Sequence, residues 1–301
     1  APWATPSRPS SADASSMEPS TPVLPTQVTP PELALSDAAP HAIVGVEAVA
    51  VPVLPGDDDT GPALGPGAEE LSEQLGVDLL ALLEAEKATG KVGEVVRFPV
   101  PLGGPTNADL RWVLLVGVGD QGTDALRRAG ATLARATVGR SSVATSIASL
   151  TDDAGLEAFV VGAVLGSFSF SWRSQERPES APVARIVLTG CAEDRRPALE
   201  RGLALGGAGW RARLLATVPS NLKNPPWLAE QARLVAEEAG LAYRVWDERQ
   251  LAAEGFGGII GVGQGSATPP RLVRLDYTPR KANRRTPTVV LVGKGITFDT
   301  G

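Results

Sequence analysis

The stretch WVLLVGVG at residues 112–119, followed by TDALRRAGATLARAT at residues 123–137, decides the fold class of this chain. The first segment is a continuous apolar run, which is typical of a strand covered on both faces. The second segment places apolar residues at helical spacing, with Thr123 as its expected N-cap. A buried strand that leads into an amphipathic helix predicts an α/β unit.

The same alternation of strands and helices extends on both sides of this pair. Strands are expected at AIVGVEAVAVPVL (42–54, with a break at Pro52), VGEVVRFPV (92–100), SVATSIASL (142–150) and ARIVLTG (184–190). Helices are expected over 69–85, with an interruption at Gly76, and around 156–164. We therefore predict a layered, macro-like α/β domain over residues 39–192.

A long helix over residues 193–216 is expected to connect this domain to a second one. Its apolar residues fall on one stripe, and it should end before Pro219. The stripe consists of Leu199, Leu203, Trp210 and Leu214. The segment therefore has the pattern of a helix with one buried face.

The second domain, residues 217–301, opens with strong helix signals. Asn224 and Pro225 predict a helix start, and Gly240 predicts its end. Asp247 and Gln250 have capping-box spacing for a short helix. Strands are expected at LAYRVW (241–246), RLVRLDY (271–277) and TVVLVG (288–293), the last buried on both faces. This pattern predicts the start of a truncated α/β domain.

Composition limits the remaining possibilities. Residues 1–38 are rich in Pro, Ser, Thr and Ala, so we expect a disordered tail. The formal net charge is −6, and there is no long basic run, which disfavours nucleic acid and anionic membranes as partners. Apolar runs are too short for a membrane span. A single cysteine, Cys191, excludes a disulfide framework and favours a reducing compartment.

Histidine-based catalysis is also disfavoured, because His41 is the only histidine and it adjoins the expected tail. Two glycine-rich segments suggest phosphate loops, yet both patterns are incomplete. GVGDQG (117–122) lacks the acidic residue that ends the next strand of a dinucleotide site. GVGQGS (261–266) is followed by two prolines instead of a helix start. We expect a tight strand-to-helix turn at GVGDQG, whereas GVGQGS leaves open a loop shaped by its backbone near a ligand cleft.

The last ten residues, VGKGITFDTG (292–301), have a different character. Lys294 follows the expected buried strand directly, between Gly293 and Gly295, and Asp299 lies five residues later. Ligand sites of α/β sheets lie beyond the carboxyl ends of strands. A desolvated lysine amine and a carboxylate can both ligate a metal, although a solvated lysine and a turn aspartate give the same spacing.

VGKGITFDTG resembles the signature with which the leucyl aminopeptidase family enters its active site. The resemblance continues upstream through PSNLKNPPWLAEQARLVAEEAGLAYRVWDERQLAAEGFGGIIGVGQGSATPPRLVRLDYTP (219–279) and LGSFSFSWRS (165–174). It is strong after residue 195 and weaker over the preceding residues from about 40 onward. Thr217 and Val218 depart from the Asn-Thr that the family usually has before Pro-Ser-Asn.

The resemblance implies a metal-dependent aminopeptidase that releases N-terminal residues, often leucine, from peptides. It assigns Lys294 and Asp299 as metal ligands, with Asp299 bridging two divalent ions, manganese or zinc. It also implies a cytoplasmic hexamer with no bound organic cofactor. The catalytic residues and the other ligands are expected beyond Gly301, so we expect the chain alone to be inactive. The alternatives are a nucleotide-type binding module and a non-catalytic scaffold.

Overall fold

The structure is a computed structural model, and it describes residues 24–56, 60–172 and 180–297. Contacts divide the chain into two compact units. The larger unit runs from Pro25 to Val218, and the smaller one begins at Pro219. Each unit is described separately below.

A mixed, mainly parallel sheet forms the centre of the larger unit. Its strands are β1 (Glu32–Ser36), β2 (Ala48–Leu54), β3 (Ala63–Leu64), β4 (Val95–Pro99), β5 (Trp112–Gly117), β6 (Ser142–Thr145) and β7 (Arg185–Thr189). The order is β1-β7-β6-β2-β5-β4, and β3 pairs with β2. The pairs of β4 with β5 and of β3 with β2 are antiparallel, and the other pairs are parallel.

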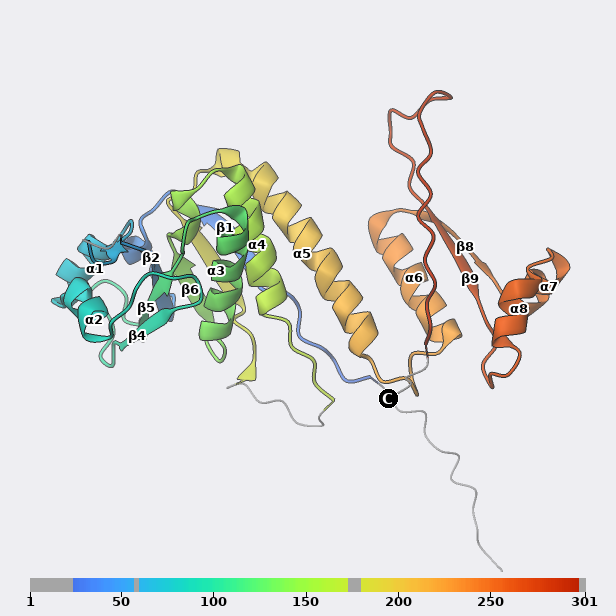
Figure 1. The fold of residues 1–301 in the computed structure, drawn as a ribbon, viewed down its shortest axis with the longest axis horizontal. Helices are drawn as coiled ribbons and strands as arrows, with labels where there is room; N and C mark the ends of the chain where they lie inside the picture. The colour runs from blue at the N-terminus through green and yellow to red at the C-terminus, as the bar shows by residue number, and fades with distance from the viewer. Residues whose placement is uncertain (1–23, 57–59, 173–179, 298–301) are drawn as a thin grey trace, which may run out of the picture. The chain divides into compact units, whose positions relative to one another are not determined.

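Helices cover both faces of this sheet (Figure 1). They are α1 (Ala68–Leu75), α2 (Leu79–Ala85), α3 (Thr123–Ala136), α4 (Asp153–Gly166) and α5 (Arg196–Thr217). One core joins Leu114, Leu133 and Phe159, on the side of α3, α4 and α5. The other joins Val113, Leu71 and Leu83, on the side of α1 and α2. The α/β layered fold predicted from the sequence is confirmed.

Helices α3 and α4 pack unusually closely because glycines lie at their contact. A Cβ atom on Gly162 would stand 1.9 Å from the backbone oxygen of Arg127, and one on Gly130 would stand 2.2 Å from that of Phe159. No side chain fits in such a space. Helix α5 contains the predicted stripe, with Leu199 and Trp210 buried.

Several predictions for the larger unit were wrong. The strand expected over residues 142–150 ends at Thr145, and Ile147–Leu150 forms a short 3-10 helix. Residues 32–36 are not part of a disordered tail, because β1 pairs in parallel with β7. Leu33 is buried there, which offsets the ordering entropy of a segment in a Pro- and Ser-rich context. Pro52 does not break its strand, β2. Proline has no backbone N–H to donate, but β6 pairs with β2 only as far as Ala50, so Pro52 removes no hydrogen bond between these two strands.

The smaller unit contains helix α6 (Pro225–Ala239), the antiparallel pair β8 (Ala242–Trp246) and β9 (Leu272–Asp276), and two short helices, α7 (Glu248–Ala253) and α8 (Gly257–Gly263). The predicted caps are confirmed. Asn224 accepts from the backbone N–H of Trp227 at 2.9 Å, and Gly240 ends the helix with φ of +64°. Asp247 and Gln250 form a capping box.

The segment TVVLVG at 288–293 is not the buried strand that its composition predicts. It forms no strand, and its apolar side chains are exposed, with Leu291 and Val292 each 93% accessible. A strand requires a hydrogen-bonded neighbour, and no described residue pairs with this segment. Across the described ranges, none of the helices combines the length and apolar composition that a bilayer crossing requires.

Candidate functional site

The segment around Lys294 lies beside helix α6 within the smaller unit (Figure 1). A Cβ atom on Gly295 would stand 3.2 Å from Cδ2 of Leu228, so the backbone at this position lies against α6. The Lys294 side chain is exposed and has no ion-pair partner among the described residues. The structure therefore presents this amine to solvent, with a permissive glycine on each side.

Asp299, the second predicted ligand, lies outside the described residues. Within the ranges that the structure does describe, no group of three or more His, Cys, Asp or Glu side chains could hold a metal ion. A stable site for two divalent cations needs more oxygen donors than Lys294 and one carboxylate supply. The described residues thus do not by themselves fit a two-metal centre, and no reaction step is assigned to one.

The two other motifs of this unit are explained by packing. Gly263 lies against Pro270, whose Cδ would be 2.7 Å from a Cβ atom at the glycine. Arg271 follows these prolines and pairs with Glu248 at 2.7 Å. Residues 261–263 end helix α8, so GVGQGS is a helix end followed by a turn that packs against Pro270.

The GVGDQG turn joins β5 to α3 in the larger unit. A Cβ atom on Gly117 would stand 2.1 Å from the backbone oxygen of Lys91, and Gly119 has φ of +60°. The Asp120 carboxylate accepts from the N–H of Gly122, the N-cap of α3, at 3.0 Å. A carboxylate at this helix start disfavours a bound phosphate, which argues against the nucleotide module. Thr123 is the first helical residue and not the cap.

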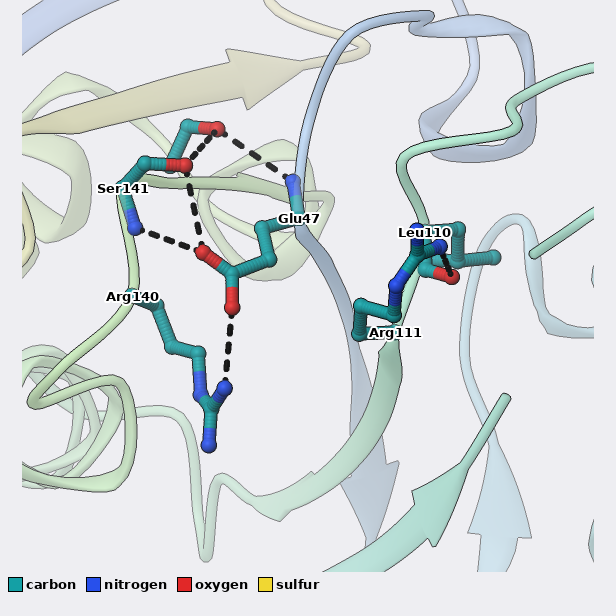
Figure 2. A network of polar contacts seen from close by, with 6 residues as sticks. Glu47, Leu110, Arg111, Arg140 and Ser141 are labelled. Carbon is teal, nitrogen blue, oxygen red and sulfur yellow. Dashed lines mark hydrogen bonds and ion pairs between the residues drawn. The ribbon is translucent and has the colours of Figure 1, made fainter. Parts of the chain in front are cut away.

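A polar network joins the start of β2 to the loop before β6 (Figure 2). The Glu47 carboxylate accepts from Nη1 of Arg140 at 2.9 Å and from the backbone N–H of Ser141 at 2.9 Å. Although burial raises the pKa of Glu47, these hydrogen bonds outweigh it and hold the pKa below its usual value. The Arg140 guanidinium also lies 5.2 Å from the ring centre of Trp112.

The single cysteine does not provide a nucleophile. Cys191 is buried, and burial raises the pKa of its thiol, although the neighbouring Arg195 partly offsets this. The thiolate is the reactive form, so a raised pKa makes the group inert. Cys191 is therefore a packed residue just beyond β7.

Comparison with known families identifies both parts of the chain. Residues 43–174 match the N-terminal domain of the cytosol aminopeptidase family, and residues 210–301 match its catalytic domain. The chain belongs to the cytosol aminopeptidase family. The family resemblance inferred from VGKGITFDTG is confirmed, since the catalytic-domain match includes that motif.

Similar proteins of this family occur in mycobacteria. The chain is 37% identical over 286 residues to proteins from Mycobacterium bovis and Mycobacterium tuberculosis, each named "Probable cytosol aminopeptidase". A protein of the same name from Mycobacterium marinum is 36% identical. These alignments cover 90% of this chain and 54% of each relative. The chain thus spans about half the length of the curated relatives it matches.

Solved structures show the same fold. The bottromycin maturation enzyme BotP in complex with Mn is 28% identical, with a TM-score of 0.61, over 78% of this chain and 46% of that one. A mutant of tomato leucine aminopeptidase has a TM-score of 0.70 at 19% identity, over 87% of this chain and 54% of that one. The second likeness supports the fold alone.

Three arginines that no sequence motif marks line one hollow of the larger unit. They are Arg97 on β4, Arg135 on α3 and Arg140 in the Glu47 network. The sequence does indicate which face of its strand Arg97 lies on, because the alternation of side chains in VVRFP places Arg97 on the same face as Val95. Nothing in the sequence shows that the three approach one another.

Proposed function

We propose that the protein is a metal-dependent aminopeptidase that removes residues, leucine-type residues among them, from the N-termini of peptides. The observation that carries this proposal is the match of residues 210–301 to the catalytic domain of the family. It includes Lys294 and Asp299 in the motif where the family binds metal. The turn at GVGDQG gives no comparable support to a nucleotide-binding function.

Lys294 and Asp299 are the proposed protein ligands of two divalent ions, manganese or zinc, with Asp299 bridging them. Two observations support this. BotP, which is 28% identical, was solved with Mn. In this chain, Lys294 is exposed between two glycines, so its amine is accessible to an ion. The pair comes from one segment and supplies too few donors alone, so we expect residues 1–301 to show no turnover by themselves.

The assembled protein is proposed to act as a homohexamer in the cytoplasm, with peptides as its substrates. The support is the family membership and the printed names of the relatives.

Substitution in the whole protein tests the site. Lys294→Ala and Asp299→Ala should each lower bound metal and kcat for leucine amide by at least about 100-fold, because losing a direct ligand weakens a site as much as losing its supporting contacts or more. Asp299→Ala should be the more severe, since a bridging carboxylate holds both ions. Metal content by mass spectrometry and steady-state hydrolysis are the measurements.

Lys281→Ala is the matched control, because Lys281 is an exposed lysine of the same unit outside the motif. It should leave both quantities unchanged. Full metal content with near-normal turnover in Asp299→Ala would refute the ligand assignment. Chelator-insensitive hydrolysis by the whole wild-type protein would refute the metal dependence itself.

A further inference from the structure

A hollow of about 310 Å³ lies between edge strand β4 and the C-terminal half of α3, in the larger unit. Arg97, Arg135 and Arg140 line it, with Trp112 as an aromatic wall. None of the described residues that line it is acidic. In a chain with a net charge of −6, this is a local concentration of positive charge. An adjoining hollow of about 570 Å³ shares Arg97 and Arg135 and has one acid, Glu86, on its wall.

Arg97 belongs to the helix-facing side of the sheet. It lies directly opposite Leu114 in the antiparallel pair of β4 and β5, and opposite residues share a face. Leu114 is buried in the core beneath α3, so Arg97 extends from the same face at the edge that α3 leaves open. A charge is costly near a core unless it has a partner or solvent.

Arg135 reaches the hollow from the last turn of α3. Neither Arg97 nor Arg135 forms a hydrogen bond or an ion pair with any described residue. Each therefore keeps all five N–H donors available for a ligand.

Arg140 is held in place by two contacts, and one of them, the ion pair with the Glu47 carboxylate, offsets part of its charge. One terminal nitrogen donates to Glu47 at 2.9 Å (Figure 2), and the guanidinium also lies over the ring of Trp112. These two contacts, from Glu47 just before β2 and from Trp112 on β5, restrict the rotamers of this long side chain. Less entropy is then lost when it binds a ligand.

The helix end does not cancel this positive charge. A helix C-terminus repels anions through its free carbonyls. In α3, the Thr137 hydroxyl donates to the carbonyls of Leu133 and Ala134, at 2.9 and 3.2 Å. The backbone N–H of Arg140 donates to the carbonyl of Thr137. Three carbonyls at this helix end, those of Leu133, Ala134 and Thr137, are therefore satisfied internally.

We propose that this hollow binds a small multivalent anion composed of phosphate or carboxylate groups. Arg97 and Arg135 are its main donors, and Arg140 contacts it from a fixed position. Planar guanidinium groups bind such oxyanions through paired hydrogen bonds, and a bound anion supplies the charge partner that Arg97 and Arg135 do not have among the described residues. All the residues that line the site belong to the larger unit, Pro25–Val218.

A purely structural role makes a different prediction. An inward charge on an edge strand prevents pairing with other chains, and an arginine in the last turn favours the helix dipole. Under that alternative, Arg97 and Arg135 affect aggregation or stability but bind nothing.

Isothermal titration calorimetry on the purified full chain, at constant ionic strength, separates these roles. The titrants are pyrophosphate and citrate. We expect saturable binding of at least one of them, weakened by at least about tenfold in Arg97→Gln and in Arg135→Gln, as loss of a charge-assisted hydrogen bond predicts. Tighter pyrophosphate binding identifies phosphate ligands, and tighter citrate binding identifies carboxylates.

Arg185→Gln is the matched control, because Arg185 is an exposed arginine of the same unit that does not line the hollow. It should change the affinity by less than about twofold. Arg135→Lys keeps the positive charge but removes the planar guanidinium, so its affinity should lie between those of wild type and Arg135→Gln. It also provides a conservative variant in case Arg135→Gln does not fold. The proposal is overturned if neither titrant binds saturably, or if Arg185→Gln weakens binding as much as Arg97→Gln does.

Discussion

The two units of this chain differ in how their structure is stabilised. In Pro25–Val218, helices cover both faces of one sheet, and two apolar clusters fill the layers. In the described part of the smaller unit, few apolar side chains are buried: Leu222, Ala229, Ala236, Trp246 and Leu251. The strongest functional motif of the chain thus lies in the unit with less of its own core.

In this chain, the sequence patterns that predict the fold and the motif that predicts the function lie in different units. The larger unit is recognised by periodicity, because burial on two faces requires it. The smaller unit is recognised by a motif, VGKGITFDTG, whose glycines and ligand-type residues reflect chemistry more than packing. The comparison can be tested by removing one large apolar side chain from each unit and measuring the change in the free energy of unfolding.

The largest expected effect is that of Phe159→Ala. Phe159 is fully buried in α4, within the core under α3 and α5, so its removal leaves a cavity. We expect the free energy of unfolding of the larger unit to fall by about 3–5 kcal/mol. Urea unfolding followed by far-ultraviolet circular dichroism measures this.

Leu291→Ala is the paired control in the smaller unit. Leu291 is 93% exposed, so we expect a change within about 0.5 kcal/mol. A loss comparable to that of Phe159→Ala would contradict the comparison, because it would mean that residues 288–293 are packed in solution.

Local signals made helices easier to predict than strands. Asn224, Gly240 and the pair Asp247 and Gln250 act on backbone groups within a few residues, so sequence spacing alone defines them. The strand expected at TVVLVG needs a partner from elsewhere, and its apolar composition carries no information about whether one is present.

The remaining errors have the same origin. Strand β1 was hidden because a Pro- and Ser-rich context outweighed the alternation of Leu33 and Leu35. Its formation depends on the edge of β7, about 150 residues away. The arginine hollow likewise requires β4, α3 and the loop before β6 to meet. The motif predicts both proposed metal ligands, Lys294 and Asp299, and the structure describes only Lys294.

A smaller effect is expected from Glu47→Gln, which tests polar stabilisation in the larger unit. The carboxylate accepts three hydrogen bonds, one from Arg140 and two from Ser141. A neutral amide accepts them more weakly, so we expect a loss of about 1–2 kcal/mol at neutral pH. Urea unfolding of both proteins over a range of pH measures it.

The pH dependence has a defined sign. The pKa of Glu47 is lower in the folded protein than in the unfolded chain, so its stabilisation is present above the unfolded value and is lost as the pH falls through the folded one. The difference between wild type and Glu47→Gln should therefore shrink below about pH 4. Glu73→Gln, on the exposed surface of α1, is the control and should change the free energy of unfolding at neutral pH by less than about 0.5 kcal/mol. A pH-independent loss at Glu47 would instead indicate a packing effect.

The smallest expected effect is that of Asp247→Ala, in the smaller unit. Asp247 accepts from the N–H of Gln250 at 2.8 Å, and the Gln250 side chain accepts from the N–H of Asp247 at 3.0 Å. Losing this cap costs about 1 kcal/mol, so amides of α7 should exchange with deuterium about fivefold faster. Asp247→Asn keeps an acceptor and should stay near wild type. Arg249→Ala, on the same helix, should also have little effect, because alanine is the better helix former. If Asp247→Ala instead unfolds the whole smaller unit, that unit is more cooperative than its few buried side chains indicate, and the contrast with the larger unit fails.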